Sequence, residues 1–73
     1  MFLSIIIPAY NESNRINKTL NELIGYFDKK KYKWEIIVVD DGSIDETRNE
    51  VSKIVKSDGR VKLIISKKKL WER

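Results

Sequence analysis

Residues 35–43 read Glu-Ile-Ile-Val-Val-Asp-Asp-Gly-Ser, and this stretch decides which fold the sequence predicts. Its four consecutive apolar residues are all β-branched, which favours an extended strand over a helix. Because neighbouring strand residues point to opposite faces, both faces of this strand are hydrophobic, as in parallel sheets that are covered on both sides. The Asp-Asp-Gly-Ser that follows is turn chemistry. The stretch therefore predicts a buried parallel strand that opens directly into a polar loop.

Two similar apolar runs lie on either side of this strand in the sequence. Leu3-Ser4-Ile5-Ile6-Ile7 stops at Pro8, and Val61-Lys62-Leu63-Ile64-Ile65 follows the turn pair Asp58-Gly59. Each run is short, rich in β-branched residues and bounded by turn residues, as strands usually are. The sequence therefore predicts three strands, over residues 3–7, 35–39 and 61–65.

Two amphipathic segments separate the predicted strands and are expected to be helices. In residues 16–27 the apolar side chains recur at helical spacing, and Ser13 is the expected N-cap. In the second segment, Ser43-Ile44-Asp45-Glu46 has the Ser-x-x-Glu pattern of a capping box. Gly59 is expected to supply the left-handed residue just after that helix ends. The apolar faces consist of Ile16, Leu20, Leu23, Ile24 and Phe27 in the first segment and of Val51, Ile54 and Val55 in the second.

Strands that alternate with helices predict an α/β fold with parallel strands joined by crossovers. If both crossovers step the same way, the strand order is 3-2-1 and both helices lie on one face of the sheet. The other face then has no cover, although the strands carry apolar residues on both sides. We therefore expect residues 1–65 to form half of a doubly wound, Rossmann-like sheet, whose open face is covered by a missing C-terminal half or by another subunit.

The composition limits the chemistry that is open to this chain. It has 73 residues and 8.6 kDa, enough for one small domain or part of one. Cysteine and histidine are both absent, which excludes disulfides, thiolate metal sites and the commonest general base. Any chemistry must rest on carboxylates, hydroxyls, lysines or the backbone.

The net charge of +4 is concentrated in residues 66–73. Residues 1–65 contain eleven basic and ten acidic residues, whereas the tail has four basic residues against one acidic residue. A basic tail is weak support for nucleic-acid binding, and we expect no nucleic-acid partner. No segment has the roughly 20 apolar residues of a membrane span, and no basic leader precedes the first strand. A cytoplasmic location, or one at the cytoplasmic face of a membrane, is therefore expected.

Polar residues follow the first two predicted strands, and the carboxyl ends of parallel strands are where ligands bind in open sheets. After the first strand, Tyr10 offers an aromatic face for a nucleobase and Glu12 offers a hydrogen-bonding group. After the second strand, Asp40 is expected to point into the same cleft and accept a hydrogen bond from a base or ribose. Asp41 is expected to orient the Gly42-Ser43 turn. The residues alone leave open an ordinary turn in the first case and helix capping in the second.

Residues 4–12, Ser-Ile-Ile-Ile-Pro-Ala-Tyr-Asn-Glu, and residues 35–47, Glu-Ile-Ile-Val-Val-Asp-Asp-Gly-Ser-Ile-Asp-Glu-Thr, together resemble the start of a family-two glycosyltransferase of the GT-A fold. Among subgroups of this family, the two motifs are most similar to those of polyprenyl- and dolichyl-phosphate sugar synthases. The resemblance implies a nucleotide-sugar-binding half-domain over residues 1–65. Its implied nucleotide-binding residues are Pro8, Ala9, Tyr10, Glu12, Asp40 and Asp41.

The resemblance also implies a reaction for the full-length enzyme. Such enzymes transfer a sugar from a nucleotide-diphosphate donor to a lipid-phosphate or glycan acceptor by a single inverting displacement. A carboxylate deprotonates the acceptor, and Mg²⁺ or Mn²⁺ neutralises the leaving diphosphate. The family's metal-binding Asp-x-Asp and its catalytic base lie beyond a fourth strand, which this chain lacks. We therefore expect no catalytic and no metal-binding residue here, and no sugar transfer by the chain alone.

Two other functions compete with this interpretation. The chain could be a non-catalytic remnant or interaction module whose bare sheet face binds another chain. It could also be a receiver-like phosphoacceptor domain, because Val38-Val39-Asp40-Asp41 is an acidic strand end. Receivers carry that pair on their first strand, so this alternative is disfavoured. After residue 65 the sequence departs from the glycosyltransferase pattern, because a lysine-rich tail replaces an Asn- and Gly-rich stretch.

Overall fold

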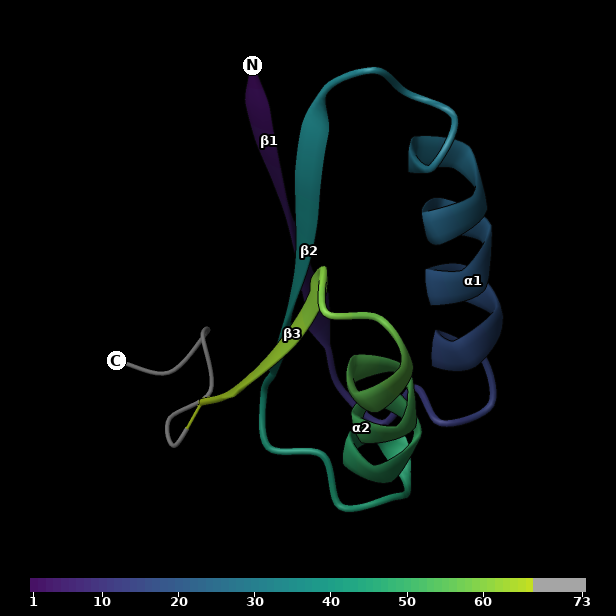
Figure 1. Ribbon diagram of the computed structural model, residues 1–73. Coiled ribbons are helices and arrows are strands. Elements are labelled where there is room, and N and C mark those ends of the chain that lie inside the picture. The colour runs from purple at the N-terminus through teal and green to yellow at the C-terminus, as the bar shows by residue number, and fades with distance from the viewer. Residues whose placement is uncertain (67–73) are drawn as a thin grey trace.

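The computed structural model describes residues 1–66, which form a three-stranded parallel sheet and two helices (Figure 1). The elements are β1 (Phe2–Ala9), α1 (Ile16–Phe27), β2 (Lys33–Asp40), α2 (Thr47–Ser57) and β3 (Val61–Ile65). β2 lies in the middle and pairs in parallel with both β1 and β3. The predicted α/β fold and the 3-2-1 strand order are therefore confirmed, while the rest of the basic tail, residues 67–73, lies outside the described residues.

β1 and β2 are each eight residues long, which is longer than predicted. Their pairing runs without interruption from Phe2 opposite Lys33 to Ala9 opposite Asp40. Pro8, which was expected to end the first strand, lies inside it. β1 is an edge strand within the described sheet, and proline is tolerated there because its missing N–H need not donate to a neighbouring strand. The longer strands carry both polar loops to the same edge of the sheet.

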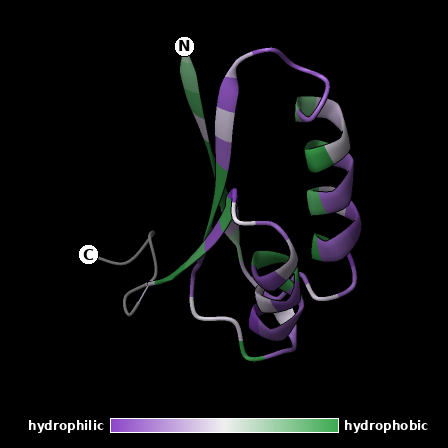
Figure 2. Ribbon diagram, in the orientation of Figure 1, coloured by the Kyte–Doolittle hydropathy of each residue, from purple (hydrophilic) through white to green (hydrophobic). Residues whose placement is uncertain are grey.

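Both helices cover the same face of the sheet, as predicted (Figure 1). The hydrophobic side of α1 faces the strands, and its hydrophilic side faces solvent (Figure 2). Alternate residues of β2, from Trp34 to Val38, are buried against the helices. The buried hydrophobic core consists of Ala9, Ile16, Leu20, Trp34, Ile36, Val38, Val51, Ile54 and Val61.

The opposite face of the sheet is left open by the described residues. Ile6 is 58% exposed and Ile64 is 52% exposed, and Ile37 lies half-buried on the strand between them. At the amino end of this face, Glu35 accepts hydrogen bonds from the Ser4 hydroxyl at 2.6 Å and the Lys62 ammonium at 2.7 Å. These contacts lower the pKa of Glu35. The expected uncovered face is thus present. Ser4, Glu35 and Lys62 form a polar row across its amino end, and isoleucines occupy the face beyond it.

The helix ends differ from their predictions. Ser13 is not the N-cap of α1, because the helix begins at Ile16 after Arg15 and no side chain caps it. The capping box is also wrong, because α2 begins at Thr47 with Glu46 at its N-cap position, and the Glu46 side chain makes no capping hydrogen bond. Gly59 does not supply a left-handed residue, since the only glycine with a positive φ in the described chain is Gly42.

Candidate functional site

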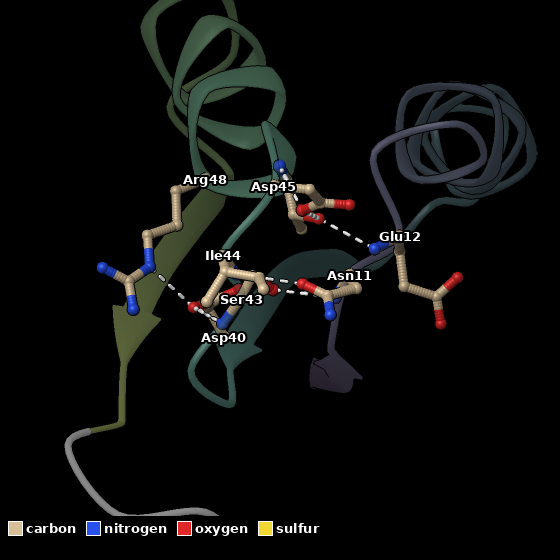
Figure 3. A network of polar contacts seen from close by, with 8 residues as sticks. Asn11, Glu12, Asp40, Ser43, Ile44, Asp45 and Arg48 are labelled. Carbon is tan, nitrogen blue, oxygen red and sulfur yellow. Dashed lines mark hydrogen bonds and ion pairs between the residues drawn. The ribbon is translucent and has the colours of Figure 1, made fainter.

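The site is built from two loops at the carboxyl end of the sheet, residues 10–15 after β1 and residues 41–46 after β2. Asn11, in the first loop, forms hydrogen bonds to the second loop through both its backbone and its side chain (Figure 3). Its backbone N–H donates to the Ser43 hydroxyl at 2.9 Å, and its side-chain Oδ1 accepts from the Ile44 N–H at 2.9 Å. The two loops are therefore neighbours that are fastened to each other, which is the arrangement that the sequence predicted.

Thr47 and Asp45 fasten the same two loops at a second point. The Glu12 N–H donates to the Thr47 hydroxyl at 2.8 Å, and that hydroxyl donates in turn to the Asp45 carboxylate. The Ser13 N–H also donates to Asp45, at 3.2 Å. Asp45 further accepts the Thr47 N–H at 2.9 Å and so satisfies an amide at the start of α2. These hydrogen bonds lower the pKa of Asp45 to about 2, with the Thr47 hydroxyl making the largest contribution.

Two residues in the site have left-handed backbones, and each stands where its loop turns. Asn11 has φ 49°, a region that asparagine tolerates better than most residues because its short side chain can bond locally. Gly42 has φ 86°, which suits a residue without a Cβ. These conformations direct the N–H groups and side chains that join the loops.

Asp40 has a different role from the one predicted. Its side chain is fully buried on the helix-covered face, where Oδ2 accepts hydrogen bonds from the Ser43 N–H at 3.1 Å and the Arg48 Nε–H at 2.7 Å. Burial alone would raise the pKa of Asp40, but the bonds from Ser43 and Arg48 outweigh it and lower that pKa. Asp40 thus orients the turn, the role predicted for Asp41, instead of pointing into the cleft.

The second oxygen of Asp40 is not matched by a donor. Oδ1 is buried and has no hydrogen-bond partner. Arg48 contacts only the other oxygen, and its side chain is 40% exposed at the site's rim. The charge pair is therefore half buried and bonded through a single oxygen, and Ser43 and Arg48 together hold the carboxylate in its ionised form.

The six residues predicted to bind a nucleotide divide into two groups by exposure. Pro8 and Tyr10 are exposed, the latter by 45%, and Glu12 is half-buried. The other three, Ala9, Asp40 and Asp41, are buried, at 2%, 0% and 7% exposure. The Asp41 N–H donates to the Ala9 carbonyl at 2.8 Å, which extends the pairing of β1 with β2 into the loops. The first group can reach a ligand, and the second shapes the surface beneath it.

Pro8 and Glu12 also border a cavity of about 240 Å³ on the outer side of the first loop. Across it the Glu12 carboxylate pairs with the Arg15 guanidinium at 2.5 Å. The remaining walls come from Ile7, Ile16 and Thr19.

Sequence reasoning missed three side chains that hold the site together: Asp45, Thr47 and Arg48. Asp45 and Thr47 were visible only as the start of a helix, and their reach to the first loop depends on how the two loops meet in space. Arg48 lies eight residues from Asp40 and is the second residue of α2, a helix that the sequence predicted to start earlier. Correct placement of the helix start would have put Arg48 beside the strand end.

Within residues 1–66, no three acidic side chains gather into one group that could hold a metal ion. We therefore assign no ligand here to the ion that the resemblance implies. Neither described helix is long and apolar enough to cross a membrane.

Comparison with known proteins agrees with the geometry. Residues 4–71 match the model of the family "Glycosyl transferase family 2". The dolichyl-phosphate beta-glucosyltransferase of Saccharomyces cerevisiae is 48% identical over 58 residues, which are 77% of this chain and 17% of that enzyme. The human dolichyl-phosphate beta-glucosyltransferase is 35% identical over 66 residues, 84% of this chain and 20% of the enzyme. This chain thus spans about a fifth of its curated relatives.

A solved structure also matches. TarS of S. aureus, residues 1–349 in complex with UDP, superimposes with a TM-score of 0.76 and 33% identity, covering 94% of this chain and 20% of that one. It is similar to this chain in fold as well as in sequence. The fold, the two fastened loops and these matches lead to one conclusion: the chain belongs to glycosyl transferase family 2.

Proposed function

We propose that this chain is the part of a sugar transferase that binds the nucleotide of a nucleotide-diphosphate sugar. The observation that carries the proposal is the fastening of the two loops at the carboxyl end of the sheet by Asn11, Ser43, Asp45 and Thr47. Fastened loops hold their outward-facing side chains in one geometry before a ligand arrives, which lowers the entropy cost of binding.

Within this site we assign contact to the exposed group and support to the buried group. Tyr10 would stack on the nucleobase, and Glu12 would accept a hydrogen bond from it. Ala9, Asp40 and Asp41, which are buried, would shape the floor beneath the ligand. The structure of TarS in complex with UDP supports a uridine nucleotide as the first ligand to test.

For the full-length protein we propose transfer of the sugar to a lipid-phosphate acceptor. The support is the similarity to dolichyl-phosphate beta-glucosyltransferases, of which this chain covers about a fifth. The metal ion and the catalytic base would come from residues outside those described, so the 73-residue chain alone would transfer no sugar. Incubating the purified chain with labelled UDP-glucose, dolichyl phosphate and Mg²⁺ or Mn²⁺ tests this, and any lipid-linked sugar would contradict it.

Titration of the ¹⁵N-labelled chain with UDP and, separately, GDP tests the binding itself. We expect the backbone signals of Tyr10 and Asp41 to shift, while that of Tyr26 does not. Tyr26 is a matched control because it is also exposed, by 57% against 45% for Tyr10, but lies at the far end of α1. Tyr10→Ala should weaken binding by about tenfold, in the range for loss of one base–aromatic stack. Equal effects of Tyr10→Ala and Tyr26→Ala would refute the site.

A further inference from the structure

A second recessed surface lies at the opposite end of the sheet, around the starts of the strands. A cavity of about 370 Å³ is lined there by Phe2, Asp28, Lys30, Tyr32, Lys33, Trp34 and Arg60. Since β1 spans eight residues, this amino-end cavity lies about 25 Å from the loops of the nucleotide site. It is therefore separate from the site already described.

Three of the seven residues that line the amino-end cavity are aromatic, and further contacts hold Trp34 and Arg60 in place. The Arg60 guanidinium lies over the Trp34 ring, 4.1 Å from its centroid. Arg60 in turn pairs with Asp28 and Asp58, each at 2.9 Å, which raises the pKa of Arg60. Phe27 packs against Trp34 from α1, with ring centroids 5.8 Å apart. These contacts keep the concave shape without a ligand.

Two of the residues that line the cavity, Lys30 and Lys33, are lysines without an ion pair within the described residues. Lys29 and Lys31 flank Lys30 in the sequence and form no ion pair there either. Lys30 is held over the Tyr26 ring, 4.4 Å from its centroid. With Arg60, this end has five basic residues against Asp28 and Asp58. Residues 1–65 have a net charge of only +1, so positive charge is concentrated at the amino end and the rest is slightly negative.

We propose that the amino-end cavity is a docking site for an acidic polypeptide segment of a partner protein, which inserts an apolar side chain between the aromatic walls and places carboxylates against the lysines. The charge complementarity selects an acidic partner, because Lys30 and Lys33 line the cavity without forming an ion pair and attract carboxylates. The cavity of about 370 Å³ is large enough to take one or two apolar side chains, which favours a polypeptide segment as the occupant.

Fluorescence of the full 73-residue chain can test the docking site. The chain has two tryptophans, so Trp71→Phe leaves Trp34 as the reporter. The probe is a hexapeptide in which leucine and phenylalanine are flanked by two acidic residues on each side. We expect saturable perturbation of Trp34 emission by this peptide and none by the same peptide with lysines in place of the acids.

Matched charge reversals then locate the contact. Lys30→Glu with Lys33→Glu should weaken peptide binding by about tenfold, as expected for the loss of two ion pairs. Lys18→Glu with Lys56→Glu makes the same change in net charge on the exposed surfaces of α1 and α2 and should leave binding unchanged. Circular dichroism of each variant confirms that it is folded. Phe2→Ser, at a 60% exposed side chain, tests the apolar wall independently and should weaken binding by a smaller factor.

Three results would overturn the docking proposal. The first is no saturable response to the acidic peptide. The second is an equal loss of affinity in the two charge-reversal variants, which would mean that attraction is not local. The third is co-sedimentation with phosphatidylcholine–phosphatidylglycerol vesicles, lost in Lys30→Glu with Lys33→Glu, without peptide binding, which would make this end a membrane surface.

Discussion

The two faces of the sheet are made by the same three strands, yet only one is covered. On the helix-covered face Ile36 and Val38 are fully buried, whereas the next residues along β2, Ile37 and Val39, are only half-buried on the open face. The strands therefore contain more apolar surface than two helices can bury. The comparison shows that these strands are suited to a thicker, three-layered arrangement, in which the open face meets further protein.

The largest difference in stability between the two faces is expected when neighbouring isoleucines in β2 are truncated. Ile36→Ala should lower the free energy of unfolding by about 2–5 kcal/mol, because it leaves a cavity in the core. Ile37→Ala makes the same chemical change one residue later on the open face and should lower it by less than about 1 kcal/mol. Urea unfolding of both variants, at a chain concentration low enough to keep them monomeric, measures the difference. Equal losses would mean that the open face is covered even in the monomer.

The next largest loss of stability is expected at Thr47, in the hydrogen-bond network at the carboxyl end of the sheet. Thr47 is fully buried, and its hydroxyl both accepts from Glu12 and donates to Asp45. Thr47→Val keeps the shape but removes both hydrogen bonds, so we expect a loss of about 1–3 kcal/mol in unfolding free energy. Thr19→Val, at an exposed position on α1, is the control. Similar stabilities for the two variants would show that the loops are not held together by this hydroxyl.

Acid should destabilise the protein through Asp45, the carboxylate that helps hold the two loops together. Asp45 has its pKa lowered from 3.8 to about 2 in the folded chain. A folded-state pKa below the unfolded value stabilises the protein above the unfolded pKa, and that stabilisation is lost as pH falls through the folded pKa. Stability should therefore fall between about pH 4 and pH 2, and Asp45→Asn should reduce the slope. Thermal melts across this range measure it, and an unchanged slope would contradict the assignment.

The smallest effect on stability, and the sharpest on association, is expected at the open face itself. Ile6→Thr combined with Ile64→Thr should change the unfolding free energy by less than about 1 kcal/mol, because both side chains are more than half exposed. We propose that this apolar face drives self-association of the isolated chain, and the double variant should reduce it. Sedimentation velocity of both proteins at several concentrations is the measurement. A monomeric parent chain would refute the proposal.

The sequence predicted the elements of the fold because their signals are local. The β-branched runs and the helical spacing from Ile16 to Phe27 each lie within a few residues, and the structure contains the three strands and two helices they indicate. The helix starts were missed because Ser13 and Ser43 matched local capping rules, while in the structure their backbone or side chain bonds across the loops. The direction of Asp40 was missed for the same reason, since its partner Arg48 is supplied by a neighbouring element.

The way the loops are fastened has a consequence for how this surface can change over evolutionary time. The first loop contributes mainly backbone amides, those of residues 11, 12 and 13, to the bonds with the second loop. A main-chain amide survives any substitution except proline. Substitutions of Glu12 could therefore change which molecule the proposed site recognises while the hydrogen bonds between the loops persist. The same fold could then evolve to bind different donors without losing stability.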